Sequence, residues 1–323
     1  MFRYPWFRFW FVAALLVWLV LFFRFNDLAF LAEHWFYPAI MVVGAFVAGS
    51  TPEGGGAVAF PVLNIFLQID RVMARDFSLM IQSIGMTSAS IFILCSTPDR
   101  RVFRPLLWMI PACFAGFVLG MQLLQQLPVY IIQALFLSLI TAFALVYSVG
   151  KHRGCQAELR TPKGYEWGVL LMVLLAGGIC ASLFGTGADI ILYTLLVTLF
   201  RMQEKRATQL AIMLMAAISV SGFIWRGLVE QQLSAYQIQT WLCAYPVVLV
   251  MAPLGALVLA KVNKELMLKG IAILNLAQLG YFLFYNPSEG KWLWASLFML
   301  VLSLVFSYAI WRLGQNKVVQ AAG

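Results

Sequence analysis

Three consecutive glycines, with one proline before them and another after, break the apolar sequence near the start of this chain. Residues Ser50–Ala57 read S-T-P-E-G-G-G-A and separate the apolar segments 36–49 and 57–67. Glycine is a poor helix former and proline lacks an N–H group, so this stretch predicts irregular backbone between two short helices. At membrane depth, irregular backbone is tolerated only where it is buried in protein or lines a cavity.

A second break of the same kind follows later in the chain. Residues Ser182–Asp189 read S-L-F-G-T-G-A-D and separate the apolar segments 166–183 and 188–200. Broken helices in corresponding positions of two halves are the best sequence pointer to the binding site of a membrane transporter. We therefore expect the two breaks to form one site.

Composition supports a membrane location. The chain has 323 residues, of which 63% are hydrophobic and 11% are charged, whereas soluble domains carry about 25% charged residues. Apolar runs of roughly 20 residues recur along its length, so we predict an all-α polytopic membrane protein with about eight full transmembrane helices and two broken-helix hairpins. The full spans are expected at 1–23, 77–95, 105–124, 129–149, 207–225, 237–260, 266–285 and 292–312.

Several functional classes are disfavoured. The net charge of +9 comes from basic residues in short loops, where they set membrane orientation, so nucleic acid is not an expected partner. The five cysteines and two histidines show no metal-ligand spacing, so no metal or other cofactor is expected. Neither an acid-rich metal motif nor a nucleophile with its base is evident, so we do not expect an enzyme.

The distribution of basic residues selects between two topologies. If each broken segment enters the membrane and returns, and both termini are cytoplasmic, only five of the 22 basic residues lie outside. If each segment crosses once, the split is nearly even. The hairpin topology is therefore favoured, and the two hairpins enter from opposite faces. The five outside residues are Arg24, Arg71, Arg75, Arg226 and Lys291.

An internal repeat accompanies the two breaks. With a shift of 131 positions, ten residues of 54–93 are identical in 185–224, including the pairs Gly54/Gly185 and Arg75/Arg206. A duplicated unit inserted in opposite orientations is an inverted repeat, which many secondary transporters contain. The predicted organisation is one membrane domain, 1–323. It consists of an extra N-terminal helix (1–35), a first repeat half (36–150), a cytoplasmic linker (151–163) and a second repeat half (164–323).

The two glycine motifs resemble those of the TauE/SafE family of sulfite and organosulfonate permeases. The first copy reads P-E-G-G-G-A-V-A-F-P-V-L over Pro52–Leu63, and the second reads F-G-T-G-A-D-I-I-L over Phe184–Leu192. In the second copy Thr186 replaces the central glycine and Leu192 the proline. The similarity spans about 40 to about 285. It implies import or export of a small anion, often a sulfur oxyanion, sulfonate or carboxylate.

The breaks themselves are the candidate anion site. The second arm of each hairpin should begin near Gly56 and Gly187, and the first N–H groups of a helix bind anions readily. The two helix starts should face each other near mid-membrane. The candidate substrate-binding residues are Ser50, Thr51, Glu53, Gly54, Gly55, Gly56, Ala57, Ser182, Gly185, Thr186, Gly187 and Asp189.

Each of these residues also has a structural explanation. The glycines could serve only close helix packing, and the hydroxyls of Ser50, Thr51, Ser182 and Thr186 could cap helices rather than bind oxyanions. Glu53 and Asp189 are the acids of the two breaks, and each could carry a coupled proton. For Asp189 we favour the alternative, a capping box with Thr186. For Glu53 we favour the functional role.

Other polar residues could line a path to the site. Gln82, Ser83, Thr87 and Ser90 follow one helical segment, although small residues at a helix contact would show the same pattern. Arg75 is expected outside, where it either pairs with Asp70 or Asp76 or attracts anions. Arg206, its repeat mate, is expected to be a cytoplasmic anchor.

The sequence thus favours a secondary transporter of small organic or sulfur-containing anions in the bacterial inner membrane. Its expected partners are a small anionic substrate and the lipid bilayer, and a proton is the candidate coupling ion. An anion channel is the first alternative, because hairpins of this kind also build pores. An integral membrane enzyme is a weaker one.

Overall fold

The computed structural model of the chain describes residues 1–149, 156–258 and 264–321, and this part is helical. The first five residues of the expected linker 151–163 lie outside the described residues. The helices are α1 (Pro5–Phe25), α2 (Leu28–Glu33), α3 (Phe36–Ser50), α4 (Gly56–Pro61), η1 (Val62–Phe66), α5 (Arg71–Ser96), η2 (Arg100–Phe103), α6 (Leu106–Leu123), α7 (Val129–Val149), α8 (Tyr165–Phe184), α9 (Ala188–Thr198), α10 (Glu204–Ile224), η3 (Trp225–Val229), α11 (Ala235–Val258), α12 (Lys264–Tyr285) and α13 (Lys291–Ala321).

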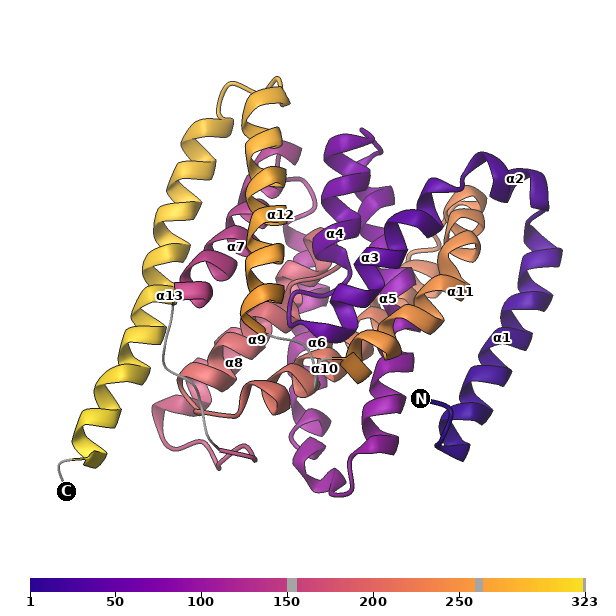
Figure 1. Cartoon of the computed structure of the whole chain (residues 1–323). Coiled ribbons are helices and arrows are strands. Elements are labelled where there is room, and N and C mark those ends of the chain that lie inside the picture. Colours follow the sequence, from indigo (N-terminus) through magenta and orange to yellow (C-terminus); the bar gives the residue numbers. More distant parts are fainter. Residues whose placement is uncertain (150–155, 259–263, 322–323) are drawn as a thin grey trace.

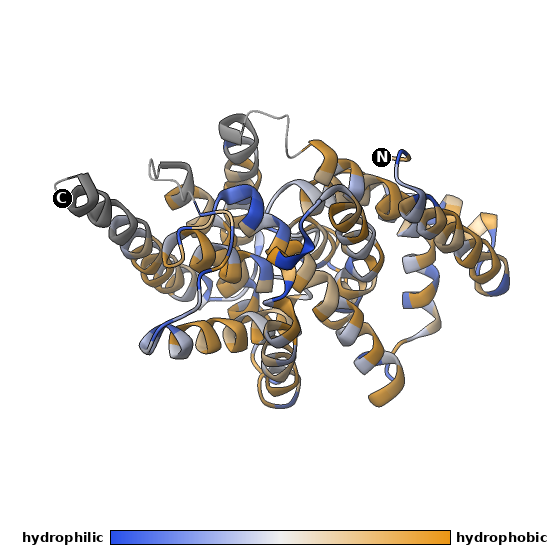
Figure 2. Ribbon diagram, turned by 90° about the horizontal axis from the view of Figure 1, so that it is seen from below, coloured by the Kyte–Doolittle hydropathy of each residue, from blue (hydrophilic) through white to orange (hydrophobic). Residues whose placement is uncertain are grey.

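Eight helices in the described part are long and apolar enough to cross a membrane, which confirms the predicted class. They form a layered bundle in which α5 is the most buried span, with 78% of its apolar window buried, and α13 the least, with 11%. Figure 2 shows hydrophobic ribbon around the periphery and hydrophilic stretches near the centre. Helices α1 and α13 therefore present most of their apolar surface outward, as lipid-facing helices do.

The two broken segments are hairpins that enter from opposite ends of the bundle. In Figure 1, α3 and α4 lie in the upper half, whereas α8 and α9 lie in the lower half. Both chain ends lie at the lower end of the view. The first arms of the two hairpins differ in length: α3 has 15 residues and α8 has 20. Helix α8 is thus long enough to cross a membrane by itself, a point that the sequence left open.

The order of elements supports the predicted repeat. Shifting α5 (Arg71–Ser96) by 131 positions gives 202–227, close to the continuous helix Glu204–Val229 formed by α10 and η3. Helices α3, α4, α6 and α7 correspond in the same way to α8, α9, α11 and α12. The division into two halves stays a prediction that this order supports.

Each hairpin packs against the opposite half of the chain. The first arm α3 lies along α11, and the first arm α8 lies along α6. Both crossings depend on missing side chains: a Cβ atom at Gly49 would lie 1.8 Å from the carbonyl oxygen of Ala252, and one at Gly178 would lie 1.9 Å from that of Cys113. Close backbone contact through small residues is the common way to join helices in a membrane.

A buried ion network joins α5, η3 and α11 at the upper end. Asp76 pairs with Arg75 at 2.7 Å and with Arg226 at 2.8 Å, and it accepts a 3.1 Å hydrogen bond from Gln237. The Asp76 side chain is fully buried, and both arginine side chains are at most 3% exposed. Arg226 also pairs with Glu230. Of the two roles considered for Arg75, the structure thus shows the ion pair.

The crossing of α6 and α8 predicts that Gly178→Ala destabilises the protein. The added methyl group overlaps the Cys113 carbonyl, and overpacking of this kind typically costs about 1–3 kcal/mol. Gly168→Ala on the exposed part of α8 is the matched control, because nothing lies within 4 Å of its Cβ position. Thermal unfolding in detergent should show a lower Tm for Gly178→Ala only. Equal Tm values for the two variants would contradict the close crossing.

The ion network predicts a large effect for Asp76→Asn. Arg226 then keeps only Glu230 as an ion-pair partner and Arg75 loses the carboxylate it pairs with, and breaking a buried pair costs about 3–5 kcal/mol. Asp70→Asn is the control, because this exposed residue caps the start of α5 and asparagine caps a helix about as well as aspartate, so little stability should be lost. The measurement is the unfolding temperature in detergent, and a larger decrease for Asp70→Asn would refute the assignment.

Candidate functional site

The tips of the two hairpins meet in the interior. A Cβ atom at Gly54 would lie 2.4 Å from Asp189 Oδ2 and 2.7 Å from Thr186 Oγ1, and one at Gly56 would lie 2.6 Å from Thr186 Cβ. No side chain fits at either glycine, so the first tip touches the second with its backbone. Gly54 also has a φ of +70°, which favours glycine. Close packing is therefore part of what these glycines do.

The first tip keeps free backbone donors. The N–H groups of Gly54, Gly55, Gly56 and Ala57 form no hydrogen bond of good geometry to any other residue in the described part of the chain. These groups precede and begin the helix Gly56–Phe66, made of α4 and η1, where a helix carries partial positive charge. All four residues are buried. The first tip can therefore donate several backbone hydrogen bonds to an anion.

The second tip differs, because a carboxylate of its own helix already bonds part of its backbone donors. Asp189 Oδ1 accepts hydrogen bonds from the N–H groups of Gly187 (3.2 Å) and Ile190 (3.1 Å). The carboxylate of α9 itself occupies the place expected for an anion. Asp189 thus stabilises the start of its own helix, but the predicted capping box with Thr186 is not formed, because the Thr186 hydroxyl has no partner.

Three of the four hydroxyl groups in the breaks already donate hydrogen bonds to backbone carbonyls. Ser50 donates to the Phe46 carbonyl at 2.7 Å, Thr51 to the Val47 carbonyl at 2.9 Å, and Ser182 to the Ile179 carbonyl at 2.7 Å. They bond within their own helices, as Ser and Thr often do. Thr186 is the exception, since its buried Oγ1 atom has no hydrogen-bond partner.

Glu53 is 2% exposed and lies at the first tip. Both of its carboxylate oxygens accept hydrogen bonds from Asn275 Nδ2, at 3.2 and 3.1 Å, and within the described residues no basic side chain pairs with it. A buried carboxyl group that is hydrogen-bonded to an amide side chain can bind and release a proton, which is the property that proton relays use.

Helix α12 supplies polar residues that the sequence analysis did not single out. Asn275 contacts Glu53, and Gln278, nearly one turn further along, has no hydrogen-bond partner for either side-chain atom. Both residues are 1% exposed. The sequence could have identified these residues, because two amide side chains lie three positions apart within the apolar segment 266–285, and a buried polar group in a membrane helix requires an explanation.

The predicted path-lining residues are distributed unequally. Gln82 reaches the second tip, where its Nε2 donates to the Gly185 carbonyl at 2.7 Å. Ser83 and Ser90 donate to carbonyls of their own helix α5, and Thr87 is half-buried. A path-lining role for these three stays a prediction. Arg206 lies at the lower end beside a hollow of about 420 Å³, whose other basic lining residues are Arg3 and Lys205.

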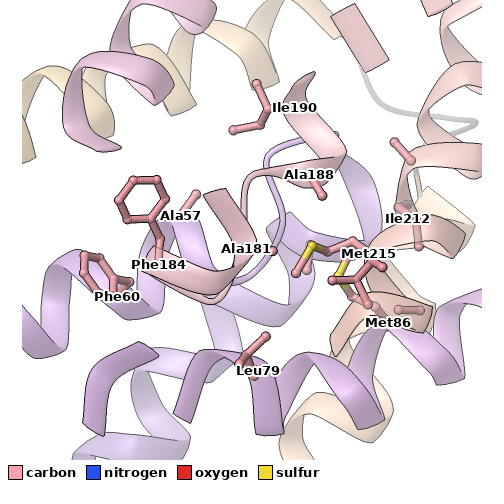
Figure 3. Close-up of a cluster of buried hydrophobic side chains, with 14 of the residues drawn as sticks. Ala57, Phe60, Leu79, Met86, Ala181, Phe184, Ala188, Ile190, Ile212 and Met215 are labelled. Carbon is pink, nitrogen blue, oxygen red and sulfur yellow. The ribbon is translucent and has the colours of Figure 1, made fainter. Parts of the chain in front are cut away.

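Aromatic and aliphatic side chains surround the contact between the tips. Phe60, Phe136 and Phe184 pack against one another, edge to face or tilted, with ring-centroid distances of 4.7 to 6.0 Å. Figure 3 shows Ala57 and Phe60 of the first hairpin beside Phe184 of the second. These apolar side chains exclude water from one side of the contact, so charges there interact strongly. Within the residues described, no cluster of three or more His, Cys, Asp or Glu side chains is placed to hold a metal ion.

Comparison with known proteins gives one match. The family model described as Sulfite exporter TauE/SafE matches residues 36–283, from the start of the first hairpin nearly to the end of α12. No curated protein and no solved structure matches the chain. The matched region includes both hairpins and covers more than three quarters of the sequence. This chain is an integral, multi-pass membrane protein that belongs to the sulfite exporter TauE/SafE family.

Proposed function

We propose that this protein is a secondary transporter of a small sulfur-containing or organic anion, such as sulfite or a sulfonate, and that the first tip binds it. The observation that carries the proposal is the run of free backbone N–H groups from Gly54 to Ala57 at the buried start of a helix. Such groups bind oxyanions without a basic side chain. We infer transport from membership of the family, and we infer an anionic substrate from the free N–H groups of the first tip.

Polar hollows at the two ends support movement across the membrane. The upper hollow, of about 320 Å³, is lined by Arg71, Gln133 and Asn286 among others, and the lower one contains Arg3, Lys205 and Arg206. Between them the hairpin tips are in direct contact, with no room for a methyl group at Gly54 or Gly56. A continuous open pore is hard to reconcile with this contact, so alternating access fits better than a channel.

Two variants of Gly55 test the anion site at one position. Gly55 has a φ of −71°, which proline adopts without strain, so Gly55→Pro removes one N–H group and Gly55→Ala keeps it. A hydrogen bond to a charged group contributes about 1.5–3 kcal/mol, so Gly55→Pro should weaken anion binding by about tenfold or more. Binding is measured by thermal stabilisation in detergent and by counterflow in proteoliposomes with sulfite, sulfonates, thiosulfate, oxalate and chloride.

The two variants share the added Cβ atom, so any effect of crowding against Ala48 and Gly44 appears in both. The proposal requires that Gly55→Ala retains binding and that Gly55→Pro loses it. If both variants bind the same anion as tightly as the unmodified protein, the tip amides are not the anion site.

We further propose that Glu53 carries a proton during transport. Protonation removes its negative charge beside the anion site, and Gln mimics the protonated form, so Glu53→Gln should transport with a flatter pH dependence between roughly pH 5 and 8. Glu33→Gln, at an exposed residue at the end of α2, is the control. Counterflow rates across this pH range provide the measurement, and an unchanged profile for Glu53→Gln would exclude the role.

A further inference from the structure

Three buried oxygen atoms converge on Gly54 without any hydrogen-bond partner. They are Gln82 Oε1, Thr186 Oγ1 and Asp189 Oδ2, and they would lie 3.1, 2.7 and 2.4 Å from a Cβ atom at Gly54. The three side chains come from α5, the second tip and α9, and each is at most 2% exposed. Helix α5 and the second hairpin together therefore present acceptors at the point where the first hairpin presents its backbone.

The orientation of these acceptors is fixed by their other atoms. Gln82 Nε2 donates to the carbonyls of Ser78 (3.1 Å) and Gly185 (2.7 Å), so an amide flip would place an oxygen against two oxygens. Asp189 Oδ1 accepts from the N–H groups of Gly187 and Ile190, which leaves Oδ2 free. The free oxygens are thus a stable feature of the local fold.

Leaving such groups unpartnered is costly. Each buried acceptor without a partner costs about 1–3 kcal/mol, and a carboxylate costs more. In the described part of the chain no basic side chain forms an ion pair with Asp189. A positively charged ligand between the three oxygens would remove this cost.

We propose that Gln82, Thr186 and Asp189 bind a sodium ion at the contact between the two hairpin tips. Carboxylate, hydroxyl and amide oxygens are hard ligands of the kind that hold alkali and alkaline-earth cations. One carboxylate matches a single positive charge, whereas calcium sites use six to eight oxygens and usually several carboxylates. No hydrogen bond joins any two of the three oxygens, so a proton on one of them does not satisfy the other two.

The location suggests a role, which rests on the proposed transport function. The cation site borders Gly54, the first residue of the free amide run. A sodium ion there offsets the charge of Asp189, which also repels Glu53. Sodium and the anion then stabilise each other at adjacent sites, which is the physical basis of cotransport. Sodium sites of transporters commonly lie at broken helices near the membrane midplane.

The test measures sodium binding without any transported anion. Purified protein in detergent is unfolded thermally in NaCl or choline chloride at equal ionic strength and pH, and binding of radioactive Na⁺ is measured in parallel. We expect a saturable increase in Tm with Na⁺. Thr186→Val removes one ligand with little change in shape, and should raise the half-saturating Na⁺ concentration at least about tenfold, since loss of even an outer partner of a ligand often costs that much.

Thr194→Val is the matched control, because Thr194 also lies on the second hairpin but its hydroxyl donates to the Ile190 carbonyl. It should bind Na⁺ as the unmodified protein does, whereas Asp189→Asn should lose the response. A Tm that responds to pH but not to Na⁺, or equal Na⁺ affinity in Thr186→Val and Thr194→Val, would overturn the proposal.

Failure of this inference can be told apart from failure of the proposed function. Anion binding is measured both in choline salts, with no sodium present, and in sodium salts at the same ionic strength. Anion binding without Na⁺ binding refutes only the cation site. Na⁺ binding without binding of any anion in the panel supports the cation site and refutes the anion assignment.

Discussion

The contact between the two hairpin tips is possible only because side chains are missing. Gly54 and Gly56 approach Thr186 and Asp189 so closely that a single methyl group would separate the two hairpins. Everything that distinguishes the interior depends on this contact: the buried amides of the first tip, the buried oxygens of the second, and their position between two opposite hairpins. In a membrane such unpaired backbone persists only inside the protein.

The two tips are related by the predicted repeat but differ in chemistry. The first has Glu53 before its glycines, held by Asn275 of α12, and its amides stay free. The second has Asp189 after its glycines, and this carboxylate caps its own amides. One tip therefore mainly offers hydrogen-bond donors and the other mainly acceptors. The two tips are therefore complementary surfaces, whereas strict symmetry of the predicted repeat would make them equal.

The fold was more predictable than the site. Apolar length, glycine breaks and the placement of basic residues predicted the spans and the hairpins, because a bilayer imposes strong constraints on each segment. The site depends on contacts over long sequence separations, such as that of Asn275 with Glu53, which no local pattern encodes. The partner of each hydroxyl was likewise unpredictable, since Thr51 and Thr186 both lie in glycine-containing breaks but only Thr51 bonds within its helix.

The crossings at Gly49 and Gly178 also constrain how the protein can move. Each hairpin arm is fitted, backbone against backbone, to a long helix of the opposite half: α3 to α11, and α8 to α6. A packed interface of this kind shifts as a unit, because sliding would bring backbone atoms into collision. In a transport cycle of the proposed kind, the rigid bodies would then be composite pairs, each built from both predicted halves. A rearrangement would then move the α3–α11 pair relative to the α8–α6 pair. A simple rocking of the N-terminal half against the C-terminal half would break the packing within both pairs.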